Sequence, residues 1–139
     1  MKHAGWLLMT VASLTALLLL ANRLRPVAPP SVLTASCADL TQPCRIPYGT
    51  QVVEVRALQL PSALKPFQLE VRGLAGPITA RFGMVGMDMG PIALPLNDEP
   101  GGVAAAQVVL PLCVQGRRDW LLWLDSQAGR IEVRFVAGA

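Results

Sequence analysis

The sequence predicts an all-β protein, an antiparallel, immunoglobulin-like β-sandwich preceded by one N-terminal transmembrane helix. Three observations predict this arrangement. Residues 4–21 form one uncharged apolar run, and from residue 53 onward several short segments alternate apolar with polar side chains. Clusters of Gly, Pro, Asn and Asp separate these segments at a spacing that is typical of sandwich strands.

The apolar run AGWLLMTVASLTALLLLA at 4–21 predicts a retained membrane anchor. As a helix it would span about 27 Å, enough for the hydrocarbon core of a bilayer, and Trp6 suits the membrane interface. The alternative is a cleaved signal peptide that leaves the domain soluble in the periplasm. The anchor is favoured because the run is followed by Arg23, Arg25 and Pro26, which make a poor cleavage context.

The chain therefore divides into an anchor at 1–25, a Pro-rich linker at 26–36 and a β-sandwich domain at 37–139. The linker, PVAPPSVLTAS, has the composition of an extended, semi-rigid spacer. In the domain, every second side chain from 67 to 72 and from 130 to 135 is polar, which is the pattern of a half-buried strand. The expected strands are 53–57, 66–74, 77–82, 103–114, 119–125 and 130–136.

The charge distribution excludes nucleic acid as a partner. The 139-residue chain has 12 Lys plus Arg and 9 Asp plus Glu, a net charge of +3. Lys2, Arg23 and Arg25 flank the apolar run, which leaves nine basic against nine acidic side chains in residues 26–139. Binding to nucleic acid requires clustered Lys and Arg on the folded domain. The charge pattern instead fits a membrane-flanking role.

Two cysteines, Cys37 and Cys44, enclose the short segment CADLTQPC. They lie too far apart for a CxxC redox pair or a zinc knuckle, so a local disulfide is predicted. A disulfide implies an oxidising compartment, and we expect a single-pass protein of the bacterial inner membrane with its domain in the periplasm. Pairing of Cys113 with either of the other two cysteines stays open at this point, because three cysteines allow three single pairings.

The residue types of the domain predict a non-enzymatic protein. The one histidine of the sequence, His3, precedes the apolar run. Neither a Ser-His-Asp or Cys-His catalytic unit nor a histidine-based zinc or Cu(II) site can therefore form in the domain. No phosphate-binding or dinucleotide-binding glycine motif follows an expected strand.

The stretch FGMVGMDMG at 82–90 allows two interpretations. Met87 and Met89 would share one face of an extended strand, and a β-bulge at Gly86 would bring Met84 to the same face. Three thioethers on one face would suit Cu(I), which prefers soft sulfur ligands. The same shift would also continue the apolar face of the preceding strand, and the methionines would then be core packing.

The segment LPLCVQGRRDW contributes further candidates. Cys113 would supply a thiolate to a copper site or, alternatively, would be a buried inert thiol. Trp120 and Trp123 have opposite parity in the following strand, so one is expected in the core and the other at the surface. The exposed tryptophan, with Arg117 and Arg118, is the candidate docking surface.

The anchor, CADLTQPC, FGMVGMDMG and LPLCVQGRRDW together resemble the small membrane-anchored periplasmic β-sandwich proteins of the FixH-like and YtkA-like kind. This resemblance implies a role in Cu(I) handling or in the assembly of a respiratory oxidase. It points to Met84, Met87, Met89 and Cys113 as the ligands. The domain departs from sites that mix Met with His, which leaves Cu(I) rather than Cu(II). The alternative is a non-catalytic interaction subunit that docks onto a membrane protein complex, with the methionines as core.

Overall fold

The computed structural model describes residues 14–15 and 32–138, without the side chains of residues 88, 89 and 91. The expected helix at 4–21 therefore lies almost wholly outside the described residues. Within the described part of the chain, no helix has the length and apolar character needed to cross a membrane. The strands are β1 (Val32–Ser36), β2 (Cys44–Tyr48), β3 (Gln51–Ala57), β4 (Pro66–Arg72), β5 (Thr79–Met84), β6 (Met87–Pro95), β7 (Asn97–Glu99), β8 (Val103–Val109), β9 (Asp119–Ser126) and β10 (Gly129–Val136).

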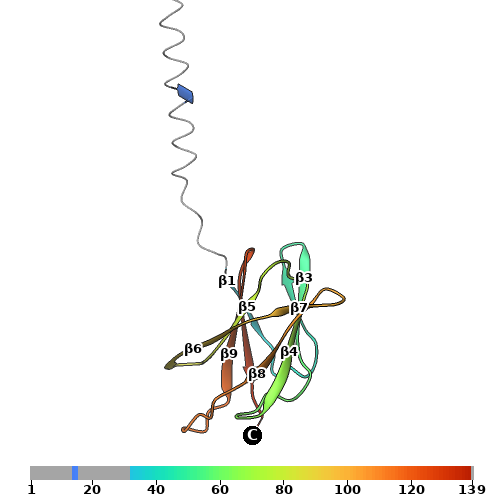
Figure 1. The fold of residues 1–139 in the computed structure, drawn as a ribbon. Coiled ribbons are helices and arrows are strands. Elements are labelled where there is room, and N and C mark those ends of the chain that lie inside the picture. Colours follow the sequence, from blue (N-terminus) through green and yellow to red (C-terminus); the bar gives the residue numbers. More distant parts are fainter. Residues whose placement is uncertain (1–13, 16–31, 139) are drawn as a thin grey trace, which may run out of the picture.

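The strands form two five-stranded sheets, and the prediction of an all-β sandwich is confirmed. One sheet has the order β1-β10-β9-β5-β6 and the other the order β2-β3-β4-β8-β7. Figure 1 shows them as two layers, with the C-terminal end of the chain at the bottom. Paired strands run antiparallel except β1, which pairs in parallel with β10.

The six expected strands correspond to β3, β4, β5, β8, β9 and β10. Strand β8 ends at Val109 rather than at residue 114, and the chain beyond it forms a loop that carries Cys113. The structure also contains β1, β2, β6 and β7, which the alternation of side chains did not reveal. Strand β1 lies inside the segment expected as linker, because residues 32–36 complete the edge of a sheet beside β10.

The core lies between the two sheets and is centred on aromatic side chains. Phe82 of β5 packs edge-to-face against Phe67 of β4 across the sandwich, with ring centroids 6.3 Å apart. On its own sheet it packs in the same manner against Phe135 of β10, at 6.4 Å. All three are buried, together with the alternate side chains of their strands. The core therefore fixes which face of β5 and β9 points inward.

The predicted disulfide between Cys37 and Cys44 is present, with the two Cα atoms 6.0 Å apart. Cys37 follows β1, at the edge of one sheet, and Cys44 opens β2, at the edge of the other. The bond therefore ties the two sheets together along one side of the sandwich. Cys113 is a free, buried thiol.

Candidate functional site

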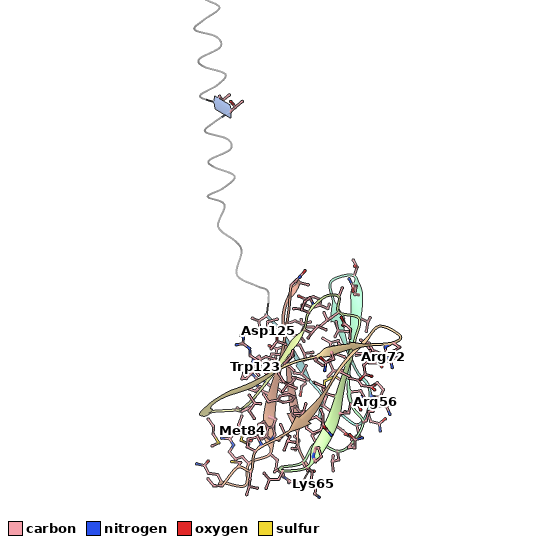
Figure 2. All side chains as sticks on the ribbon, in the orientation of Figure 1. Arg56, Lys65, Arg72, Met84, Trp123 and Asp125 are labelled. Atoms are coloured by element: carbon pink, nitrogen blue, oxygen red, sulfur yellow. A yellow bond between two sulfur atoms is a disulfide. The ribbon has the colours of Figure 1, made fainter. Side chains whose placement is uncertain are left out.

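Three segments meet at one end of the sandwich, which we call the pocket end: residues 58–65, 109–118 and 136–138. The Leu64 N–H donates to the carbonyl of Leu110 at 2.8 Å, and the Gly138 N–H donates to the carbonyl of Pro61 at 2.7 Å. Figure 2 shows Lys65 and Met84 toward this end of the molecule, which also holds the C-terminus.

A cavity of about 470 Å³ opens at the pocket end. Its size is in the range of small-molecule sites. Leu112, Trp120 and Ala137 supply apolar walls, while Cys113, Arg117 and Arg118 line the same cavity. Four of the residues singled out in the sequence, namely Cys113, Arg117, Arg118 and Trp120, are thus brought together in one place.

Met84 and Met87 face each other across a tight hairpin. Val85 and Gly86 form the turn between β5 and β6, with Gly86 at a φ of 72°, a conformation that glycine adopts without strain. This corrects the expected bulge at Gly86, because the chain reverses there instead of continuing. Met84 pairs with Met87 across the hairpin and with Trp120 of β9.

The register shift lies between Phe82 and Met84 rather than at Gly86. Phe82 pairs with Ile92 and Met84 with Met87, so Gly83 alone stands opposite residues 88–91 of β6. Gly90 has a φ of 68° within this irregular stretch. The side chain of Met89 lies outside the described residues, so its relation to the other sulfurs stays a prediction.

The sulfur of Cys113 reaches Met87. Its Sγ lies 3.8 Å from Sδ of Met87, as a thiol donor to a thioether acceptor. Cys113 is buried, and Met87 is half-buried against the core. Met84 is only 3% exposed and belongs to the core itself. The structure therefore brings the sulfurs of Cys113 and Met87 together and places Met84 in the core, and the metal-ligand role of all three stays a prediction.

Arg117 spans the loop of Cys113 and the turn that precedes Met87. Its guanidinium forms a two-point ion pair with Asp119, with Nε donating to Oδ1 at 2.9 Å. Its Nη1 also lies 3.7 Å from the place where a Cβ on Gly86 would stand. The pKa of Arg117 is raised, first by the hydrogen bond and the charge of Asp119 and to a smaller extent by the sulfur of Cys113. The charge of Arg117 is thus met first by Asp119, beside the loop that carries Cys113.

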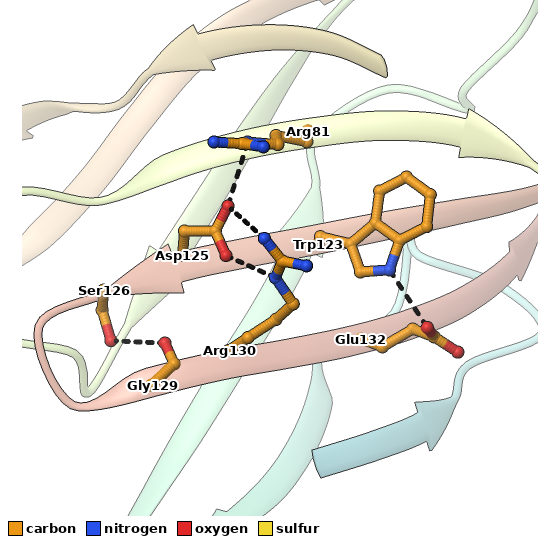
Figure 3. A network of polar contacts seen from close by, with 7 residues as sticks. All are labelled: Arg81, Trp123, Asp125, Ser126, Gly129, Arg130 and Glu132. Carbon is orange, nitrogen blue, oxygen red and sulfur yellow. Dashed lines mark hydrogen bonds and ion pairs between the residues drawn. The ribbon is translucent and has the colours of Figure 1, made fainter. Parts of the chain in front are cut away.

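Trp120 and Trp123 occupy opposite faces of β9, and Trp120 is the one in the core. Trp123 lies half-buried on the outer face, where Nε1 donates to Oε2 of Glu132 at 3.0 Å. Its ring crosses Gly83, since two ring atoms lie 2.8 Å from the place of a Cβ there. Figure 3 shows this indole beside the polar groups of the same face.

Next to Trp123, Asp125 joins two arginines. Arg130 Nε donates to Oδ1 of Asp125 at 2.6 Å, and Arg81 Nε lies 3.0 Å from Oδ2. The buried Nε of Arg81 has no hydrogen-bond partner, so its contact with Asp125 is an ion pair without hydrogen-bond alignment. This face of the sheet is therefore occupied by its own ion pairs (Figure 3).

No protein-family model, curated protein or solved structure matches this chain. The resemblance to FixH-like and YtkA-like proteins stays a prediction. In residues 14–15 and 32–138, no three His, Cys, Asp or Glu side chains are grouped so that they could hold a metal. The pair of Cys113 and Met87 is of a different kind, a thiol beside a thioether.

Reasoning from sequence missed the part of the pocket that residues 63, 137 and 138 supply. These small side chains carry no chemical signal. Gly138 packs closely against this loop, since a Cβ at this position would stand 2.6 Å from Cδ2 of Leu60. Only the fold shows that the C-terminal segment lies close to the loop after β3.

Proposed function

We propose that this protein is a membrane-anchored, non-catalytic periplasmic accessory protein that binds Cu(I) and serves the assembly of a respiratory oxidase. The observation that carries the proposal is the 3.8 Å separation of the Cys113 and Met87 sulfurs beside an open pocket. Thiolate and thioether are the soft ligands that Cu(I) selects.

The separation suits two ligands of one ion. A 3.8 Å separation is short enough for both sulfurs to bind one ion, because metal–sulfur bonds are about 2.3 Å long. Cys113 and Met87 would then hold the ion, and a donor or acceptor protein would supply a further ligand. Leu112 and Trp120 would give the Cys113 side of the site apolar surroundings.

The alternative is a non-catalytic interaction subunit, and the burial of Met84 favours it. A structural methionine is expected among core side chains, and Met84 lies there beside Trp120. In that case the thiol of Cys113 and the thioether of Met87 are in packing contact, and no copper binds.

Titration of the full-length chain in detergent with Cu(I), against a competing chelator, separates the two functions. Cys113→Ser and Met87→Leu are expected to abolish binding, because each removes one ligand. Met84→Leu is the matched control, a buried methionine replaced at similar volume, and is expected to bind like the wild type. Absence of Cu(I) binding by the wild-type chain would refute the copper function and leave the interaction subunit.

The immunoglobulin-like classification, the anchor at 4–21 and the periplasmic location are parts of the same proposal. The disulfide between Cys37 and Cys44 supports an oxidising compartment. Alkaline phosphatase fused after the C-terminus is expected to be active. An inactive fusion, with a reporter that works in the cytoplasm, would contradict the location without bearing on copper.

A further inference from the structure

The pocket end exposes an unusual number of large apolar side chains. Of the ten that the described residues expose, seven lie in its three segments: Leu58, Leu60, Leu64, Val109, Leu112, Val114 and Val136. Scattered single exposures are normal on a soluble domain, but a concentration at one end marks an interaction site. Val114 is 92% exposed at the tip of the turn in which the Gly116 N–H donates to the carbonyl of Cys113.

Leu64 stands out within this group. Its φ is 60°, and it is the one residue other than glycine with a positive φ in the described chain. A branched apolar residue in this conformation is strained by about 1–2 kcal/mol. Its side chain is 66% exposed, so packing within the domain does not offset the strain. Such an outlier in a loop points to a function for the side chain.

All the charged side chains of these three segments are basic. Residues 58–65, 109–118 and 136–138 contain Lys65, Arg117 and Arg118 and no Asp or Glu. Arg117 is paired with Asp119, whereas Arg118 has no ion-pair partner within residues 32–138. In a region that is neutral from residue 26 onward, this end therefore carries a local positive charge. The charge disfavours contact between two copies of the same surface.

The pocket end also faces away from the point where the chain enters the domain. Val32 opens β1 and pairs with Arg130 near the start of β10, whereas the pocket end follows the last residue of β10, Val136. The length of that strand, about 25 Å, separates the two. A partner at the pocket end is thus met on the side opposite to residue 32.

We infer that the pocket end binds a segment of a second protein that presents an apolar side chain flanked by carboxylates. The apolar side chain enters the cavity between Leu112 and Trp120, Leu64 and Val114 cover it from the rim, and Lys65 and Arg118 meet the carboxylates. This arrangement of an apolar anchor inside a polar rim is the usual anatomy of a protein interface. The inference goes beyond copper binding and holds without it.

The test uses a displayed library of random peptides of about twelve residues, selected on the full-length chain in detergent. Enriched peptides are expected to combine Leu, Phe or Trp with adjacent Asp or Glu. Leu64→Asn and Arg118→Glu should each weaken a selected peptide about tenfold, and added salt should weaken it further. Asn tolerates a positive φ, so the first variant is expected to keep the wild-type melting temperature. Val32→Asn is the control, a change at an exposed apolar residue of the opposite end.

Four results would overturn the inference. Peptides without carboxylates, or peptides that bind both variants like the wild type, would place recognition elsewhere. The proposed anchor would itself carry the chain to vesicles, so lipid is tested by competition: displacement of a selected peptide by phosphatidylglycerol but not by phosphatidylcholine would assign the surface to lipid. A dimer that Leu64→Asn dissociates would assign it to a second copy. Because none of these variants removes a sulfur, Cu(I) titration of the same samples reports separately on the copper proposal.

Discussion

The indole of Trp123 lies across Gly83, with Cη2 and Cζ3 at 2.8 Å from the place of a Cβ on that glycine. The absence of a side chain at Gly83 therefore leaves room for an aromatic ring from the neighbouring strand. The ring is also held by the hydrogen bond to Glu132, so it cannot move aside freely.

This contact predicts that Gly83→Ala changes stability in opposite directions in the wild type and in a Trp123→Ala background. Gly83→Ala is expected to destabilise the wild type by about 1 kcal/mol, because overpacking displaces the ring. In a Trp123→Ala background the same change is expected to stabilise by about 0.5–1 kcal/mol, since alanine is better than glycine within a strand. Denaturant unfolding of the four proteins measures the coupling, and simple additivity would contradict the packing described.

Removal of the central aromatic ring is expected to be among the most damaging single changes. Phe82 touches both Phe67 and Phe135, so Phe82→Ala should lower the free energy of unfolding by about 3–5 kcal/mol. Phe82→Leu keeps most of the volume and should cost about 1–2 kcal/mol. Equal effects of the two variants in chemical denaturation would argue against a cavity as the cause.

The disulfide is expected to stabilise the domain through a small loop. With a sequence separation of seven between Cys37 and Cys44, loop closure predicts a loss of about 2.5 kcal/mol for the double serine variant. Non-reducing peptide mapping should show the Cys37–Cys44 peptide in the wild type and equally in Cys113→Ala. A Cys113 peptide linked to either cysteine would contradict the pairing.

The ion pair at the pocket end predicts a weak pH dependence. The hydrogen bond from Arg117 lowers the pKa of Asp119, with burial opposing it to a smaller extent. Because the folded pKa lies below the unfolded one, the stabilisation is complete above about pH 4 and is lost as the pH falls through the folded value. On acidification, the wild type should therefore lose more stability than Asp119→Asn or Arg117→Gln. The difference should be small because the ion pair is exposed. Parallel acid titration curves would refute this.

Much of the sandwich could be read from local patterns. The alternation in β4 and β10 shows which side chains face inward, because successive side chains of a strand point to opposite sides whatever the strand pairs with. The short segment CADLTQPC likewise predicted its own disulfide, since its cysteines are neighbours in the chain.

Strands β1, β2, β6 and β7 escaped prediction for a common reason. They lie at sheet edges, so their extended form depends on pairing with β10, β3, β5 and β8 rather than on their own pattern. The turn at Gly86 was mistaken for a bulge because both use the same residue type, and the choice depends on whether the chain reverses.

In the candidate site, too, the sequence identifies the residues, whereas the fold decides which of them meet. Sequence named Cys113 and Met87 as sulfur donors, but 26 positions separate them, and nothing local indicates that one meets the other. The alternation of side chains likewise put Trp120 and Trp123 on opposite faces of one strand, but it did not indicate which face belongs to the core. Those choices depend on the register of β9 against β5, and of one sheet against the other, which the packing of distant side chains decides.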